Sequence, residues 1–269
     1  MSPELLRAWE RRYRLLEPTR SAGGLRLYSA ADLDRVRAMQ QHLAEGLAAA
    51  EAAALAAEAE PRRDQAVAFS PAAARRDLDA SLSGFDEASA HAVVDELLSI
   101  ATLDSILSDV LIPFLHELGE RWERGEITVA QEHFASSVLR GRLLGLARGW
   151  DRGTGSRVLL SCAPGERHDL GLIAFGLALR ARGFRILYLG ADTPIESVAQ
   201  TARAARPHAV VISTVSAELS KEIAAALLEL AAEYPVYLGG AGATAVEGEF
   251  PTLTGGPVEE ADRFAALTQ

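Results

Sequence analysis

The sequence contains a single cysteine among its 269 residues. One cysteine cannot form an internal disulfide, and a chain without disulfides suits a reducing compartment such as the cytoplasm. No apolar run reaches the roughly 20 residues that a membrane-spanning helix needs, and no secretory signal opens the chain. We therefore expect a cytoplasmic protein that does not contact membranes.

Lysine is nearly absent too, because Lys221 is the only one and almost all basic charge is arginine. The net charge is −10, yet residues 1–28 hold six arginines and three glutamates. That segment therefore carries a surplus of three positive charges, and the remainder carries −13. A short basic end on an acidic body indicates a site for nucleic acid, although a small arginine cluster can also be only a solvated face.

At 269 residues the chain has room for two or three domains, and 49% apolar residues are enough to form their cores. Helical segments at about 72–83, 86–101, 103–124 and 128–150 predict a four-helix bundle. Apolar strands then alternate with helices, which predicts a five-stranded parallel sheet covered on both faces. The predicted divisions are a head at 1–47, a helical arm and linker at 48–70, the bundle at 71–150, and the α/β domain at 155–269.

A histidine stands in the loop after the first predicted strand, 157–162. The loop reads Glu166-Arg167-His168-Asp169-Leu170-Gly171. Open α/β sheets bind ligands at the carboxyl ends of their strands, and the glycine would let a bulky ligand approach the backbone. A lone histidine in such a loop is nevertheless more often a surface residue or a helix cap than a metal ligand.

Small residues at two other strand ends favour the ligand interpretation. With Ser213 and Gly239-Gly240, the loop resembles the D-x-H-x-x-G signature of cobalamin-binding domains, with Glu166 replacing the first aspartate. The resemblance implies a flavodoxin-like fold in which His168 is the lower axial ligand of cobalt and Glu166 or Asp169 orients its far nitrogen. It also implies that small residues make room for the cofactor and its nucleotide tail: Gly171, Ser213, Gly239 and Gly240.

The first 45 residues show a second resemblance. A helix with Pro3 at its first position is followed by a break at Gly23-Gly24 and a short ribbon at 25–28. The order and spacing resemble the winged helix-turn-helix head of MerR-type regulators, in which arginine pairs with phosphates or guanine edges. The implied DNA contacts are Arg7, Arg11, Arg12 and Tyr13 in the helix and Arg20, Arg26 and Tyr28 in the wing. Trp9 is expected in the core of the head.

The head departs from that family at its start. MerR-type heads begin with a further helix, the first half of the helix-turn-helix, whereas here Met1 directly precedes the recognition helix. A recognition helix without that support loses packing and its fixed angle across the groove. We expect the true start to lie upstream and to add about a dozen residues, rather than this form binding DNA poorly.

The bundle contains Trp122, followed after nine residues by Glu132-His133. An antiparallel hairpin places these residues at one end of the bundle, and His133, Ser136 and Arg140 share a helical face. The plain alternative is a core tryptophan and two solvated side chains.

The spacing resembles the W-x9-E-H signature of light-responsive, cobalamin-dependent MerR-type regulators of the CarH type. That resemblance implies a bundle over the upper face of adenosylcobalamin. Trp122 would pack against the adenosyl group, Glu132 would hydrogen-bond it, and His133 would bind cobalt after light removes it.

Together these resemblances predict a multidomain α and α/β protein that is a transcription repressor and photoreceptor, not an enzyme. It would bind double-stranded promoter DNA as an adenosylcobalamin-loaded homo-oligomer, a tetramer, in the dark, and light would release it. Two alternatives are a corrinoid protein of a methyltransferase system and a regulator that senses cobalamin without light. Methylcobalamin is the alternative cofactor.

Overall fold

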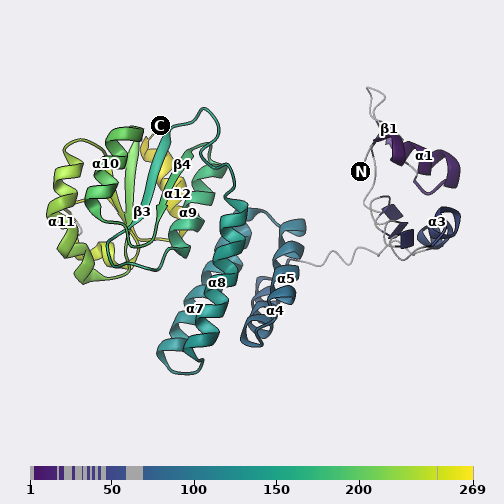
Figure 1. Ribbon diagram of the computed structural model, residues 1–269, viewed down its shortest axis with the longest axis horizontal. Coiled ribbons are helices and arrows are strands. Elements are labelled where there is room, and N and C mark those ends of the chain that lie inside the picture. Colours follow the sequence, from purple (N-terminus) through teal and green to yellow (C-terminus); the bar gives the residue numbers. More distant parts are fainter. Residues whose placement is uncertain are drawn as a thin grey trace. The chain divides into compact units, whose positions relative to one another are not determined.

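The computed structural model describes residues 3–16, 18–20, 26–27, 32, 35–36, 38–39, 42–43, 47–58, 69–246 and 248–268. The chain divides into two compact units, Met1–Phe69 and Ser70–Gln269 (Figure 1). Within the described ranges, none of the helices combines the length and the apolar composition that crossing a bilayer requires.

The N-terminal unit contains a helix and a short antiparallel ribbon. Helix α1 spans Pro3–Tyr13, and strand β1 (Thr19–Arg20) pairs with β2 (Arg26–Leu27). Trp9 is only 6% exposed, so the prediction that it belongs to the core is confirmed.

Helix α3 (Ala49–Glu58) is packed against this core, although its sequence resembles a free arm. Ala52, Ala53 and Ala56 are almost fully buried in the same cluster as Trp9 and Met39. Small side chains let a helix approach its neighbour closely, so an alanine face can pack even though each residue buries little surface.

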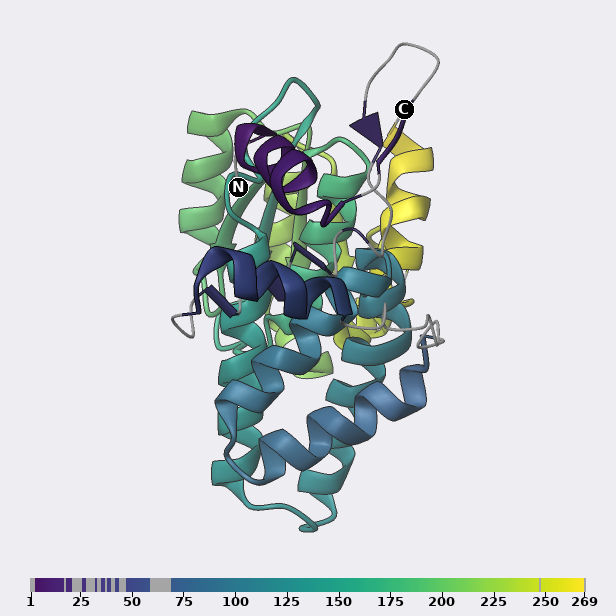
Figure 2. The same cartoon turned by 90° about the vertical axis from the view of Figure 1, so that its right-hand side faces the viewer.

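The second unit begins with the predicted bundle, and Figure 2 shows its first hairpin in front of the other bundle helices. The third helix contains a π-helical segment, η1, that the sequence analysis did not predict. Thr128 and Gln131 form a reciprocal capping box that begins the last helix. The bundle elements are α4 (Pro71–Ser83), α5 (Glu87–Ile100), α6 (Leu103–Ile106), η1 (Leu107–Leu111), α7 (Ile112–Glu123) and α8 (Val129–Leu146).

The α/β part confirms the predicted alternation of strands and helices. Its strands pair in parallel in the order β4-β3-β5-β6-β7, which is the flavodoxin-like order. The strands are β3 (Arg157–Cys162), β4 (Arg185–Gly190), β5 (Ala209–Ser213), β6 (Val236–Gly239) and β7 (Thr252–Leu253).

Helices cover both faces of this sheet (Figure 1). One apolar cluster joins α9 and α12 to one face, and another joins α10 and α11 to the other. Burial on both faces explains why the strands read as continuous apolar runs. The helices are α9 (Leu170–Ala181), α10 (Ile195–Ala205), α11 (Ala217–Ala231) and α12 (Pro257–Thr268), with a 3-10 segment η2 (Ala241–Val246) after β6.

The strand register brings the predicted strand-end residues together. Cys162 is paired in register with Ser213, and Ser213 with Gly239. Strands β3 and β5 are neighbours, while the chain leaves β3 to form β4 on the other side. The order of the strands therefore reverses at β3. In open α/β sheets such a reversal creates the crevice where ligands bind, so the fold predicts a site at the carboxyl ends of β3 and β5.

Candidate functional site

The loop after β3 presents His168 on the surface while fixing one of its ring nitrogens. The side chain is 76% exposed, and its Nδ1 lies 2.6 Å from Oε1 of Glu166. The backbone nitrogen of His168 donates to the same carboxylate oxygen at 2.9 Å. With Nδ1 engaged by a carboxylate, Nε2 is the nitrogen available to a metal, as in carboxylate–histidine–metal arrangements.

Glu166 is a buried anion held by several donors. Its other oxygen accepts hydrogen bonds from the backbone nitrogen of Val215 at 2.7 Å and from the hydroxyl of Thr214 at 3.2 Å. Burial raises the pKa of Glu166, but the hydrogen bonds from His168 and Val215 together outweigh it, and the pKa lies below its ordinary value. The ionised carboxylate favours a proton on Nδ1 of His168, which leaves the lone pair on Nε2.

Asp192, which was not among the predicted site residues, anchors the same loop from the β4 side. Its carboxylate accepts from the backbone nitrogen of Gly165 at 2.7 Å, and its own backbone nitrogen donates to the carbonyl of Glu166 at 2.8 Å. Its place just after a strand end, beside the candidate loop, is the signal that could have identified it.

Glycines at this edge serve two different needs. At Gly240 the backbone φ is +89°, and a Cβ would lie 2.5 Å from the carbonyl oxygen of Thr214, so only glycine fits the chain there. A Cβ on Gly171 would meet no protein atom within 4 Å, and one on Gly239 would make only ordinary contacts. Protein packing therefore explains Gly240 and leaves Gly171 and Gly239 open to side chains or ligands.

Cys162 lies beside this loop but is not a candidate metal ligand. Burial, with the nearby carboxylates of Asp169 and Glu166, raises the pKa of its thiol to about 12. A thiol must lose its proton to bind a metal, so Cys162 serves packing at the end of β3.

The bundle presents its own group of side chains at the end where α7 meets α8. Trp122 is 47% exposed, so the alternative that it is a core residue is wrong. Glu132 lies 2.6 Å from both Nδ1 of His133 and the hydroxyl of Ser136. Burial raises the pKa of Glu132, but the hydrogen bonds from Ser136 and His133 lower it by more. The pKa of Glu132 therefore lies below its ordinary value. The His133 side chain is 74% exposed.

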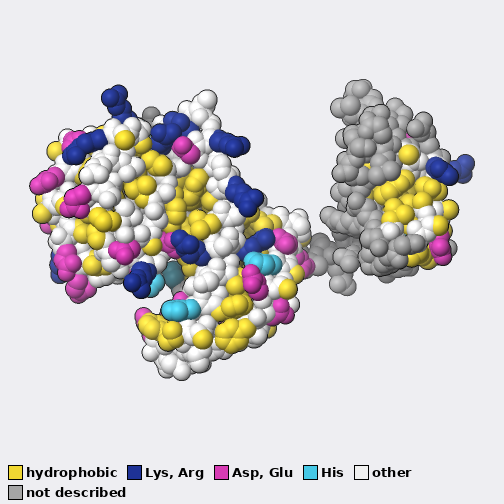
Figure 3. All heavy atoms as spheres, in the orientation of Figure 1, with side chains coloured by type: hydrophobic (Ala, Val, Ile, Leu, Met, Phe, Trp, Pro, Cys, Tyr) yellow, Lys and Arg dark blue, Asp and Glu magenta, His cyan; other side chains and the backbone are white. Residues whose placement is uncertain are grey.

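The two groups face a common space. Two turns beyond Glu132, Arg140 bonds to Asp169, the neighbour of His168. Glu132 and Arg140 are eight residues apart in the helix, a distance of about 12 Å along its axis. Figure 3 shows an outline hollowed between the α/β part and the protruding end of the bundle.

Asp169 does not orient His168, because the structure gives that role to Glu166. Its carboxylate instead accepts from Nε of Arg140 at 2.8 and 3.0 Å and from the hydroxyl of Tyr188 at 2.6 Å. The sequence left these two candidates open, since both flank His168 at similar separations.

The predicted DNA contacts lie in the expected elements, but most of their side chains fall outside the described residues. This applies to Arg7 and Arg11 in α1 and to Arg20 and Arg26 in the ribbon, and Tyr28 lies outside them entirely. Arg12 is exposed, and its guanidinium lies 5.6 Å from the ring centroid of Tyr13.

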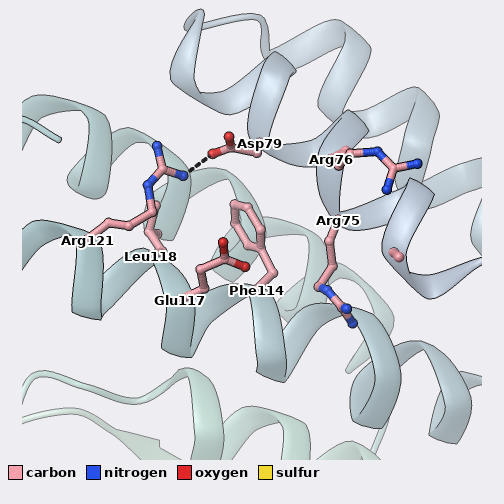
Figure 4. A pocket seen from close by; sticks show the side chains of 8 residues that line it. Arg75, Arg76, Asp79, Phe114, Glu117, Leu118 and Arg121 are labelled. Carbon is pink, nitrogen blue, oxygen red and sulfur yellow. Dashed lines mark hydrogen bonds and ion pairs between the residues drawn. The ribbon is translucent and has the colours of Figure 1, made fainter. Parts of the chain in front are cut away.

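A separate pocket of about 230 Å³ lies within the bundle, between α4 and α7 (Figure 4). Arg121 pairs there with Asp79 at 2.5 Å, and Arg75 donates to the carbonyl oxygen of Asp109 at 2.5 Å. These bonds join the bundle segments to one another, so the pocket is a polar junction away from His168.

Comparison with known proteins places the three parts of the chain in one family. Residues 1–59 match the MerR HTH family regulatory protein model, and two B12 binding domain models match residues 74–144 and 156–264. The HTH-type transcriptional repressor CarH of Myxococcus xanthus is 34% identical over 253 residues, covering 89% of this chain and 85% of CarH.

The chain belongs to the CarH and CarA family of MerR-type regulators with B12 binding domains. The HTH-type transcriptional repressor CarA of Myxococcus xanthus is also 34% identical, over 88% of this chain and 82% of its own. The protein is therefore a cobalamin-binding transcription regulator, as the two resemblances in its sequence predicted.

Solved structures confirm the fold class of the second unit. The monomethylamine corrinoid protein of Methanosarcina barkeri matches 74% of this chain and 100% of its own, with a TM-score of 0.58 and 18% identity. That likeness concerns the fold alone. The match to MerR-type regulators at residues 1–59 distinguishes this chain from the corrinoid-protein alternative.

Proposed function

We propose that this regulator is a light-responsive repressor that binds adenosylcobalamin between His168 and the end of the bundle. The observation that carries the proposal is the exposed His168, whose Nδ1 is fixed by a buried carboxylate at the reversal point of the sheet. Neutral imidazole suits a metal such as cobalt. When bound, adenosylcobalamin supplies a cobalt–carbon bond that light can break.

The residues of this chain divide the task of holding the cofactor. His168 would hold cobalt through Nε2, while Glu166 fixes the ring through Nδ1. Gly171 would allow close approach, because a Cβ there would meet no side chain and no backbone atom from outside its own helix within 4 Å. Ser213, at the end of β5, and Gly239 and Gly240, at the end of the neighbouring strand β6, border the place for the nucleotide tail.

On the upper side, Trp122 covers the adenosyl group and Glu132 accepts hydrogen bonds from it. Glu132 is suited to this because hydrogen bonds from Ser136 and His133 support its charge. Once the adenosyl group is lost, the exposed imidazole of His133 would be available to hold cobalt. A ligand can shift an assembly only through different interactions with its states, so the loss of contacts to Trp122 would be what releases the bundle.

The dark form assembles as a tetramer on promoter DNA. Its arginine-rich head contacts the duplex through residues of α1 and the ribbon: Arg7, Arg11, Arg12, Tyr13, Arg20, Arg26 and Tyr28. Like its repressor relatives, the protein regulates rather than catalyses, so we propose no enzymatic step.

The test is reconstitution with adenosylcobalamin in the dark, followed by green light. We expect a histidine-ligated spectrum that changes with light, a fall from the mass of four chains to one by light scattering, and weaker promoter binding. One unchanged mass and DNA affinity in dark and light would contradict the light switch. A protein that does not take up the cofactor would contradict the proposed ligand.

A further inference from the structure

A buried carboxylate joins the loop of His168 to the bundle. Asp169 is only 3% exposed and lies at the start of α9, next to His168 in the sequence. Arg140 of α8 reaches it with Nε, 3.0 and 2.8 Å from the two carboxylate oxygens, and with a terminal nitrogen at 2.7 Å. A planar guanidinium bonded to both oxygens fixes orientation as well as distance.

Tyr188 of β4 completes this junction from the sheet. The hydroxyl of Tyr188 donates to the carboxylate of Asp169 at 2.6 Å. The centroid of its ring lies 5.4 Å from that of Trp150, in the turn that follows α8. Burial, followed by the hydrogen bond to Asp169, raises the pKa of Tyr188, so the hydroxyl stays a donor. The carboxylate of Asp169, at the start of α9, is therefore bonded to one side chain of α8 and one of β4.

Helix α8 also carries Glu132 and Ser136, which the proposed function places on the upper side of the cofactor. Glu132 and Ser136 precede Arg140 by eight and four residues, so all three lie along one face of the helix. A rotation of α8 at Arg140 would displace the carboxylate of Glu132, because a rigid helix transmits the movement over about 12 Å.

We infer that Arg140 is a positioning residue, which sets the pose of the bundle over the cofactor by binding the neighbour of the lower ligand. The inference rests on the proposed function. It assigns to Arg140 a role in discriminating between upper ligands of cobalamin, without contact to cobalt. A large upper ligand reaches the bundle residues and depends on that pose, whereas a methyl group does not.

A second polar junction provides the contrast within the same structure. Arg182 joins Asp262 of α12 at 2.7 Å and Asp104 of α6 at 3.3 Å. This junction also holds the bundle to the α/β part, but it involves neither α8 nor the loop of His168. Loss of Arg182 should therefore loosen the contact without selecting between upper ligands.

The experiment measures the dissociation constants of adenosylcobalamin and methylcobalamin in the dark for the full chain and for Arg140→Ala. We expect the affinity for adenosylcobalamin to fall about tenfold and that for methylcobalamin to change less than about threefold, with the histidine-ligated spectrum retained. Arg140→Lys should recover only part of the difference, since an ammonium group cannot bond both oxygens in the same way.

Three further variants keep the inference testable. The quantity compared is the ratio of the affinity for adenosylcobalamin to that for methylcobalamin. Arg142→Ala is the matched control, because it removes a charge two residues away that pairs with Asp95 inside the bundle. It should leave this ratio unchanged. Arg182→Ala should also leave the ratio unchanged. Tyr188→Phe retains the ion pair between Arg140 and Asp169 and should lower the ratio slightly. This variant replaces Arg140→Ala as the test if circular dichroism shows that Arg140→Ala does not fold.

Equal weakening of both cofactors, or no change in either, would overturn the role of Arg140. The same ratio in Arg182→Ala as in Arg140→Ala would overturn it too, because any loosening of the bundle would then suffice. If the unaltered protein binds methylcobalamin but does not prefer adenosylcobalamin, the proposed function fails, and the inference fails with it.

Discussion

The loop that carries His168 and the bundle end that carries His133 hold their histidines in different ways. His168 is bonded to a carboxylate that is itself buried and bonded to Thr214 and Val215. His133 is bonded to a partly exposed glutamate on the same helix turn. Both rings are about three-quarters exposed. The difference lies in what supports each ring. The loops that follow three strands anchor His168, whereas a single helix supports His133.

This difference indicates a fixed lower side and an adjustable upper side. Asp192 and Val215 attach the loop of His168 to segments that follow two other strands, so it cannot move without breaking hydrogen bonds between backbone nitrogens and buried or loop carboxylates. The groups of α7 and α8 move with their helices, and the junctions at Arg140 and Arg182 limit that movement. The proposed function, in which the assembly changes while the cofactor stays bound, would use such a division.

The largest expected effect comes from removing the fixed ligand. His168→Ala should weaken cobalamin binding by at least about a hundredfold, because even partners of metal ligands contribute 10–100-fold. Equilibrium dialysis with adenosylcobalamin measures the affinity, and absorbance shows the loss of histidine ligation. His208→Ala, at an exposed histidine before β5, is the control. An unchanged affinity and spectrum in His168→Ala would remove the lower side of the comparison.

Glu166→Gln tests the support beneath that ligand. The pKa of Glu166 in the folded protein is below its ordinary 4.5, so ionisation stabilises the fold. This contribution is complete above pH 4.5 and is lost as the pH falls through the lower folded-state value. We expect the variant to be about 1.5–3 kcal/mol less stable at pH 7, as is typical of hydrogen bonds to charged groups.

Urea unfolding of the cofactor-free protein at pH 7 and in acid measures this effect. The difference between the two proteins should shrink in acid, and cobalamin affinity should fall about 10–100-fold at pH 7. Glu233→Gln, at an exposed ion pair with Arg203, should have a much smaller effect. A stability difference for Glu166→Gln that is independent of pH would show that the charge is not what stabilises the loop.

Trp122→Ala tests the adjustable side. The exposed indole should cover the adenosyl group, so its loss should lower adenosylcobalamin affinity about tenfold and weaken the dark oligomer. Light scattering over a concentration series measures the assembly. Phe85→Ala alters another exposed aromatic of the bundle and should have less effect on cofactor affinity. Dark assembly identical to that of the unaltered protein would contradict the role of Trp122.

The smallest effect on affinity is expected for His133→Ala. This variant should bind adenosylcobalamin nearly normally and lose the adenosyl group in light, but its illuminated form should lack the spectrum of cobalt bound by two histidines. His116→Ala, at an exposed histidine of α7, is the control. A two-histidine spectrum that survives in His133→Ala would assign the upper position to another side chain.

The sequence alone determined the elements and the residue types at the strand ends. Continuous apolar runs predicted the parallel sheet, and the small residues Ser213 and Gly239 at two strand ends, together with the loop of His168, gave the resemblance to cobalamin-binding domains. These features are local or periodic, because burial on both faces of a sheet selects apolar residues along each strand. The resemblance in residues 2–45 likewise rested on consecutive residues.

Only the tertiary structure decided which side chains support the site. Glu166 and Val215 are 49 residues apart, and Arg140 and Asp169 are 29 apart. Such pairs have no period and no fixed spacing, so the sequence could not choose between Glu166 and Asp169 as the partner of His168. The choice follows from packing: the turn after β3 places Glu166 against the end of β5, whereas the start of α9 places Asp169 against α8. Burial then requires each carboxylate to find donors where the fold supplies them.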